Sequence, residues 1–140
     1  MADDTTDADL REILLGTRVI ALVGASPNPA RASHGVMGFL LGRGYRVIPV
    51  NPVAAGQDIW GQRVVATLAE AGEADMVDVF RQSEAVPGIV EEALAALPGL
   101  RTVWMQLGVV HPGAAARARA AGVRVVQDRC PKIEVPRLGI

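Results

Sequence analysis

The chain has 140 residues, half of them apolar, and a formal net charge of −1. This is the length of one ordinary domain, so we expect residues 1–140 to form a single domain whose first residues, 1–6, are flexible. A chain this close to neutral presents no broad basic face, and no apolar run approaches the ~20 residues of a membrane span, so neither a nucleic acid nor a membrane is expected as a partner.

The beginning of the chain is acidic, whereas a secretory signal begins with basic residues and then turns apolar. The single cysteine, Cys130, cannot form an internal disulfide, and together with two histidines it gives no metal-ligand cluster. These features favour the reducing cytoplasm as the location.

The first third of the chain predicts a short helix, a buried strand and a second helix. Asp7 is expected to cap the short helix, which Gly16 ends. Residues 19–23 (VIALV) form an unbroken apolar run, typical of a strand buried on both faces of a parallel sheet, and Gly24 ends it. Ser33 precedes apolar residues at helical spacing and is expected to cap a helix that lies on the sheet.

A strand, a glycine turn and a helix start together form an anion site, because the first backbone N–H groups of a helix point outward without partners. Only Gly24 matches the G-x-G-x-x-G dinucleotide fingerprint, and Ser26 stands at the place of the second glycine. The same residues also fit a tight strand-to-helix connection without a ligand. Gly35 and Gly38 predict a helix that approaches the sheet closely.

The remainder of the chain alternates between strands and helices. Expected strands cover residues 46–50, 64–65, 75–80, 102–106 and 123–127. Expected helices are capped by Thr67, by Ser83 and just before Pro112, and a loop covers residues 56–61. The alternation predicts an α/β protein with a three-layer Rossmann-like fold, in which a mostly parallel sheet of five to six strands has helices on both faces.

The strand order 3-2-1-4-5-6 would place the strand that ends at Gly24 beside the strand that ends at Phe80. Ligands of such sheets bind in the crevice outside the carboxyl ends of the strands at this point. The segments that meet there would be residues 24–33, 51–52, 80–81 and 107–109.

The chemistry of these segments bears on which ligand the crevice holds. A bound NAD usually needs an acidic residue at the end of the second strand, where this chain has Asn51, and an NADP site needs a basic residue that Val53 and Ala54 do not supply. Arg31 and Arg81 are the nearest groups for charge-assisted contacts to a phosphorylated ligand. We therefore expect a nucleotide whose phosphates meet residues 24–33.

Five separated motifs carry a resemblance to a known family. They are VGASPNPARAS, VIPVNP, DVFRQSEAVP, VWMQLGV and VVQDRCPKIEVPRL. In this order they resemble the CoA-binding protein family, whose domain is similar to the N-terminal CoA-binding domain of the succinyl-CoA synthetase α subunit. The resemblance covers the chain from about residue 10 onward and implies that coenzyme A lies across the crevice of a Rossmann-like fold.

The resemblance also implies which residues hold the ligand. The phosphates would lie against Gly24, Ala25, Ser26, Arg31 and Ser33, and the adenosine end would be flanked by Asn51, Pro52, Val79, Phe80 and Arg81. Members of the family often carry a basic residue directly after the Asn-Pro pair. Val53 stands there in this chain and removes one partner for a CoA phosphate.

The resemblance implies a non-catalytic role, because a chain this short has no counterpart of the synthetase's ligase domain. We therefore expect binding of CoA or an acyl-CoA, as a sensor, carrier or regulator. Two alternatives stay open, namely an NAD(P)-binding protein of the oxidoreductase type and an interaction module that has lost its ligand. The exposed faces of the alanine-rich helices would allow a homodimer without requiring one.

Four further polar residues have a structural and a functional interpretation. Cys130 follows an arginine that can lower a thiol pKa, but a buried structural thiol is the commoner case. His34 could contact a phosphate or simply lie exposed at a helix start, and His111 is expected at a helix start without a chemical role. Asp78 lies in an apolar strand and needs a hydrogen-bond partner, for example an arginine.

Overall fold

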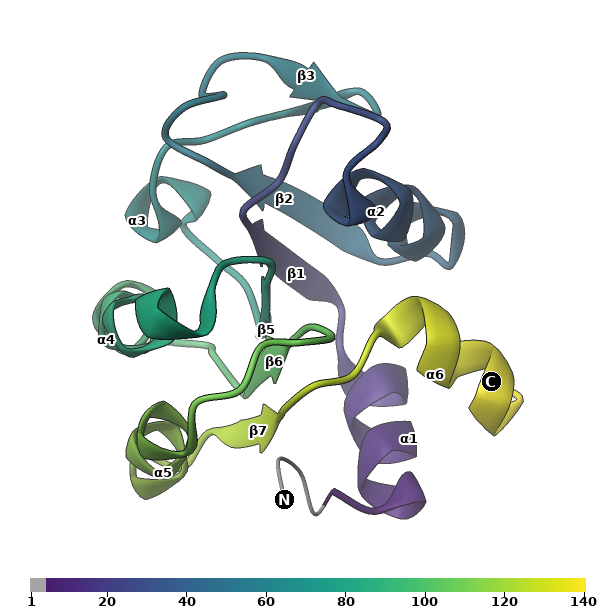
Figure 1. The fold of residues 1–140 in the computed structure, drawn as a ribbon, viewed down its shortest axis with the longest axis vertical. Helices are drawn as coiled ribbons and strands as arrows, with labels where there is room; N and C mark the ends of the chain where they lie inside the picture. Colours follow the sequence, from purple (N-terminus) through teal and green to yellow (C-terminus); the bar gives the residue numbers. More distant parts are fainter. Residues whose placement is uncertain (1–4) are drawn as a thin grey trace.

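The computed structural model describes residues 5–140 and contains a five-stranded parallel sheet with helices on both sides (Figure 1). The strands in spatial order are β2 (Arg46–Val50), β1 (Val19–Val23), β5 (Met76–Val79), β6 (Thr102–Met105) and β7 (Arg124–Val126). The helices are α1 (Asp7–Gly16), α2 (Ala32–Gly42), α3 (Leu68–Ala71), α4 (Val86–Ala96), α5 (Pro112–Ala120) and α6 (Pro131–Leu138). The predicted α/β Rossmann-like fold is confirmed.

The strand order agrees with the prediction except at one edge. β1 pairs with β2 on one side and with β5 on the other, so the direction of winding reverses between β1 and β5 as expected. The expected third strand is reduced to one parallel bridge between Val50 and Val65. β2 is therefore an edge strand of the sheet, which explains why it tolerates Pro49, a residue without a backbone N–H.

Alternating side chains of the strands enter two hydrophobic cores, one on each face of the sheet. On one face Val77, Val103 and their neighbours pack under α3, α4 and α5. On the other face Leu22 and Trp104 pack under α1, α2 and α6. Burial on both faces is the reason that the central strands are apolar throughout.

Two elements were not predicted. α6 contains Pro136, which has no backbone N–H to donate within a helix. A proline at this place in a sequence predicts the end of a helix, so α6 was not expected. The segment predicted as a loop over residues 56–61 contributes to a small antiparallel hairpin of β3 (Asp58–Ile59) and β4 (Gln62–Arg63). Strands of two residues leave no recognisable period in the sequence.

The helix caps differ from the predictions at three positions. α1 is capped by Thr6 instead of Asp7, since the Thr6 hydroxyl accepts from the backbone N–H of Asp9 at 3.1 Å. α2 has Arg31 at the N-cap, so Ser33 lies inside the first turn. Ser83 begins a short 3₁₀ segment, η1 (Ser83–Ala85), before α4, and its hydroxyl accepts from Val110 N instead of capping α4.

The predicted flexible start falls partly outside the described residues, which begin at Thr5. Thr5 donates its hydroxyl to the Val125 carbonyl at 3.4 Å. Within residues 5–140 no helix is long and apolar enough to cross a membrane.

Candidate functional site

The loops after β1, β2 and β5 meet at the carboxyl edge of the sheet, where the sequence predicted a crevice. The backbone N–H of Gly24 donates to the Val50 carbonyl at 2.9 Å, and the N–H of Phe80 donates to the Val23 carbonyl at 2.8 Å. These two hydrogen bonds join the ends of three neighbouring strands. The predicted site residues on these loops are therefore close in space although they lie up to 57 positions apart, counted from residue 24 to residue 81.

Gly24 lies at the point of closest approach. Its φ of +89° is a conformation that L side chains rarely adopt. A Cβ atom here would stand 2.7 Å from the Phe80 carbonyl oxygen and 3.2 Å from Cδ of Arg81. The absence of a side chain lets the β1 turn touch the loop after β5 and lets the stem of Arg81 lie across it.

The loop between β1 and α2 is fixed by its own polar side chains. The Ser26 hydroxyl accepts from the N–H of Asn28 at 3.1 Å, and the Asn28 side chain accepts from the N–H of Ala30 at 3.0 Å. No side chain caps α2, whose N-cap is Arg31. The first turn of α2 thus presents backbone N–H groups at the end of a rigid loop, which is the usual form of a phosphate site.

Ser33 is the buried polar residue of this turn. It is 4% exposed, yet its hydroxyl has no hydrogen-bond partner among the described residues. Within residues 5–140 no buried side-chain oxygen or nitrogen lacks a partner, so the Ser33 oxygen itself is open to solvent although most of the residue is covered. Ser33 therefore offers a hydrogen bond beside the α2 amides, although it is not the cap that was predicted.

Asn51 holds two loops together at the carboxyl edge. Its Nδ2 donates to the Ala25 carbonyl at 2.8 Å, and its Oδ1 accepts from the N–H of Val53 at 2.9 Å. Both polar atoms of the Asn51 side chain are thus bonded to the backbone of the protein. Asn51 therefore contributes to a site by fixing the positions of the two loops that border it. Pro52 is exposed beside it, and Val53 is 90% exposed with no charge to offer.

The predicted triplet after β5 divides into three different environments. Val79 is fully buried in the core beneath α3, α4 and α5, so its side chain does not line the edge. Phe80 is half-buried and packs on the other core. Arg81 is exposed and forms no ion pair with another described residue, so it is the member of the triplet with charge available for a ligand.

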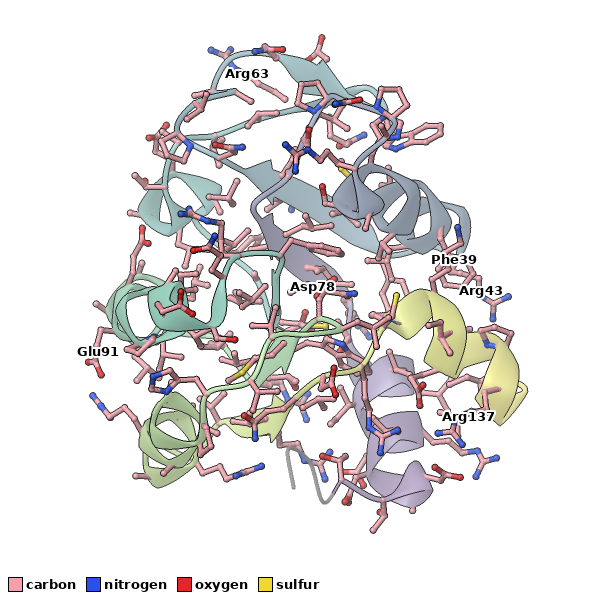
Figure 2. All side chains as sticks on the ribbon, viewed as in Figure 1. Phe39, Arg43, Arg63, Asp78, Glu91 and Arg137 are labelled. Atoms are coloured by element: carbon pink, nitrogen blue, oxygen red, sulfur yellow. The ribbon has the colours of Figure 1, made fainter. Side chains whose placement is uncertain are left out.

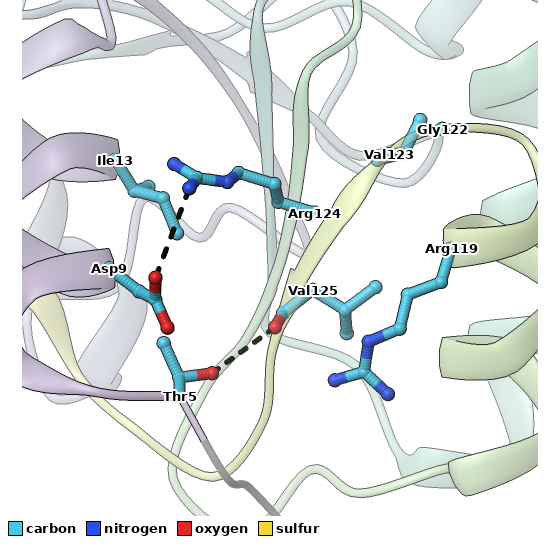
Figure 3. Close-up of a pocket in the computed structure, with 8 residues that line it drawn as sticks. All are labelled: Thr5, Asp9, Ile13, Arg119, Gly122, Val123, Arg124 and Val125. Atoms are coloured by element: carbon cyan, nitrogen blue, oxygen red, sulfur yellow. Dashed lines mark hydrogen bonds and ion pairs between the residues drawn. The ribbon is translucent and has the colours of Figure 1, made fainter.

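A groove lies at the opposite, amino edge of the sheet (Figure 3). It has a volume of about 490 Å³ and lies between the start of β7, α1 and α5. Its Arg124 is already neutralised by Asp9 at 3.9 Å and by Glu12 at 3.1 Å. This groove is thus less suited to a phosphorylated ligand than the carboxyl edge, where Arg31 and Arg81 have no such acidic neighbour among residues 5–140.

Comparison with protein-family models matches residues 18–136 to the family described as "CoA binding domain". The chain belongs to this CoA binding domain family. The match includes the strand, turn and helix of the candidate site, and it extends through the first turns of α6. The family resemblance inferred from the motifs is confirmed.

Several similar proteins match nearly the whole length of this chain. The "Uncharacterized protein YneT" of Bacillus subtilis (strain 168) is 38% identical over 127 residues, which are 90% of this chain and 91% of the relative. A solved structure of a hypothetical protein from Pyrococcus horikoshii OT3 is 36% identical, with a TM-score of 0.90 and coverage of 99% and 95%. The structure of cell-free ID.343 from Thermus thermophilus is 39% identical, with a TM-score of 0.88 and coverage of 95% and 98%.

In this CoA binding domain the hairpin brings an unpredicted aromatic pair to α2. The indole of Trp60 donates to the His34 carbonyl at 2.8 Å, and the two rings lie 4.8 Å apart. A Cβ atom on Gly38 would stand 2.7 Å from the Trp60 ring. Gly38 therefore makes room for the hairpin and not, as predicted, for the sheet, and Trp60 is 54% exposed beside the first turn of α2.

Lys132 is a second residue that the sequence reasoning missed. Its Nζ lies 3.8 Å from the position of a Cβ on Gly35, in the first turns of α2. It is the only lysine among the 14 Lys and Arg residues of the chain. The presence of a single lysine was the available signal. Because α6 was not predicted, the sequence did not show that this lysine lies near the site.

Asp78 is fully buried at the middle of the CoA binding domain (Figure 2). Its partner is the Gln106 side chain instead of the expected arginine. With the amide assigned so that its nitrogen faces the carboxyl, this nitrogen donates to the two carboxyl oxygens at 3.0 and 3.3 Å. Burial raises the pKa of Asp78 well above its ordinary value. Asp78 thus forms a hydrogen-bonded pair inside the protein, and its side chain does not line the candidate site at the carboxyl edge of the sheet.

The remaining singled-out residues have structural positions. Cys130 is buried at the N-cap of α6. His111 caps α5, with Nδ1 accepting from Ala114 N at 2.9 Å. Trp104 is fully buried and donates its indole N–H to the Arg129 carbonyl at 2.8 Å. In the part of the chain that the structure describes, no three His, Cys, Asp or Glu side chains gather to hold a metal ion.

Proposed function

We propose that this protein binds coenzyme A or an acyl-CoA at the carboxyl edge of its sheet and serves as a non-catalytic carrier, sensor or regulator. The family match over residues 18–136 is the observation that carries the proposal. The diphosphate of CoA would lie at the turn of Gly24 and the first turn of α2. The adenosine end would lie beside the loops after β2 and β5.

The residues at this edge fit such a ligand. Gly24 leaves room for a close approach, and Ser33 has a hydroxyl without a partner among the described residues. Arg31 and Arg81 are exposed cations without an acidic partner within residues 5–140, so phosphate groups can satisfy them. CoA carries a diphosphate and a 3′-phosphate and therefore supplies more than one such group.

The side chains around the edge support binding more than catalysis. Asp78 is enclosed beneath the sheet, and Asp128 accepts from the N–H of Gly108 at 2.7 Å. His34 packs against Trp60, and Cys130 is buried. None of these four pairs with another in a nucleophile and base arrangement, which acyl transfer would require.

The direct test is isothermal titration of the purified protein with CoA, acetyl-CoA, NAD and NADP after any co-purified ligand is removed. We expect saturable binding of CoA and no binding of the nicotinamide cofactors. Arg81→Ala and Arg31→Ala should each weaken CoA about tenfold or more, because a hydrogen bond to a charged group contributes about 1.5–3 kcal/mol. Arg101→Ala, which removes an exposed cation at the amino edge, is the matched control and should bind like the wild type.

The other outcomes decide between the alternatives. Binding of NAD or NADP without CoA would contradict the proposal and favour an oxidoreductase-type domain. Failure of all four compounds to bind would favour an interaction module without a ligand. Equal weakening by Arg101→Ala and Arg81→Ala would contradict the placement of the site.

A further inference from the structure

The only lysine of the chain lies in the first turn of the C-terminal helix. Cys130 is the N-cap of α6, Pro131 opens it, and Lys132 follows. α6 has eight residues and packs against both α1 and α2. Lys132 thus lies far along the chain from the turn after β1. Its helix, α6, nevertheless packs against α2, the helix that follows this turn.

The ammonium of Lys132 lies beside the beginning of α2. Its Nζ stands 3.8 Å from the position that a Cβ on Gly35 would occupy, which is ordinary van der Waals contact. α2 begins at Ala32, so Gly35 belongs to its first turn. Gly35, which has no side chain, therefore leaves room for the ammonium beside the first turn of α2.

Lys132 has no acidic partner among the described residues. The nearest carboxylate along α6 is Glu134, and two arginines already occupy it, Arg129 at 3.1 Å and Arg137 at 2.7 Å. Arg137 also forms an ion pair with Asp7 of α1 at 2.8 Å. These acidic groups of α6 and α1 are thus already paired with arginines, which leaves the charge of Lys132 available to a ligand.

A second and independent feature of the same turn points to a ligand. Ser33 is 4% exposed and its hydroxyl has no hydrogen-bond partner within residues 5–140. It precedes Gly35 by two positions on α2. The Ser33 oxygen is not itself buried, because no buried side-chain oxygen or nitrogen within residues 5–140 lacks a partner. This accessible hydroxyl, a helix start without a side-chain cap and an unpaired ammonium at one turn form a donor set that suits a phosphate oxygen.

We propose that Lys132 is a binding residue that contacts a phosphate group of the ligand, together with Ser33 and the first amides of α2. This inference rests on the proposed CoA function and adds the C-terminal helix to its site. Lys132 would supply the positive charge that Val53 does not provide beside the Asn51 loop.

The first test compares Lys132→Gln with Lys132→Arg by titration with CoA, dephospho-CoA and pantetheine. We expect Lys132→Gln to weaken CoA about tenfold or more and to leave any pantetheine binding unchanged, since pantetheine has no phosphate. Lys132→Arg should retain most of the affinity. Arg101→Gln is the control for loss of one exposed cation. A Lys132→Gln variant that binds CoA like the control would overturn the inference while the proposed function stands.

The same variants locate the phosphate. Equal weakening of CoA and dephospho-CoA would support contact with the diphosphate, and weakening of CoA alone would support contact with the 3′-phosphate. If the wild-type protein does not bind CoA, both the inference and the proposed function are wrong, so the two failures are distinguishable.

A spectroscopic test uses the fact that the chain has one lysine. Reductive ¹³C-methylation keeps the charge and gives a single dimethyl-lysine resonance besides that of the amino terminus. We expect this resonance to move on addition of CoA and to saturate at the same concentration as the binding heat. An unmoved lysine resonance in a sample that binds CoA would contradict the inference.

Discussion

A Gly24→Ala variant is expected to lose about 2–5 kcal/mol of unfolding free energy. The positive φ of +89° costs about 1–2 kcal/mol for an L residue. The new Cβ would also stand 2.7 Å from a backbone carbonyl oxygen of Phe80, which cannot rotate away as a side chain can, and the backbone shift costs about 1–3 kcal/mol more. Urea unfolding of the wild type and variant measures the loss.

Gly44→Ala separates the two contributions to this loss. Gly44 has a φ of +95° but no atom within 4 Å of its would-be Cβ. Its substitution should therefore cost only the conformational part, about 1–2 kcal/mol. Equal losses for Gly24→Ala and Gly44→Ala would show that the loops after β1 and β5 are not in close contact. Such a result would also remove the geometric basis of the site.

The second large effect concerns Asp78 and pH. Replacing Asp78 with asparagine is expected to raise stability relative to the wild type, and the gain should grow as the pH rises from 4 to 8. The carboxyl is fully buried, and desolvation raises its pKa well above the ordinary 3.8. Between pH 3.8 and the raised pKa of Asp78 the folded state holds a proton that the unfolded state has released, so the unfolding free energy of the wild type falls as the pH rises through this interval.

The sign follows from where the proton is bound. The contribution of Asp78 is fully present below pH 3.8 and is lost as the pH rises through its raised pKa. Asparagine stays neutral throughout and keeps an oxygen that can accept from Gln106. Asp7, whose pKa the hydrogen bond from Arg137 lowers, acts in the opposite direction, but it is common to both proteins and cancels in the difference.

The measurement is chemical unfolding of both proteins at several pH values between 4 and 8. A stability difference that does not change over this range would show that Asp78 has no raised pKa in the folded protein. Asp78→Leu is the complementary variant. It should destabilise the protein by about 1–3 kcal/mol, because it leaves the buried Gln106 amide without its carboxyl acceptor.

The sequence was sufficient to predict the central layers because their signals are strong and local. Residues 19–23 are apolar on both faces, and the helix over Val86–Ala96 has clear helical spacing, so the winding and the switch point followed. The hairpin around Trp60 has strands of two residues, and α6 contains Pro136. Neither the hairpin nor α6 leaves a regular hydrophobic period in the sequence. Both elements are therefore recognised only from the three-dimensional structure.

The candidate site was predictable only where it follows directly from strand ends. Gly24, Arg31 and Arg81 lie on loops that the topology brings together. Whether the Ser33 hydroxyl caps α2 or has no partner depends on the residue at which α2 begins. Sequence patterns do not fix the first residue of a helix to within one or two positions. The approach of Lys132 to Gly35 depends on how α6 packs on α2, and no spacing in the sequence encodes that long-range contact.

The central claim is that CoA binds at the carboxyl edge of the sheet. Amide chemical-shift mapping of ¹⁵N-labelled protein during a CoA titration tests it most directly. We expect the largest shifts in residues 24–35, with further shifts in residues 51–53, 80–82 and 131–133 and little change at the amino edge. Shifts concentrated around Thr5, Asp9 and Arg124, which line the groove of Figure 3, would contradict the claim.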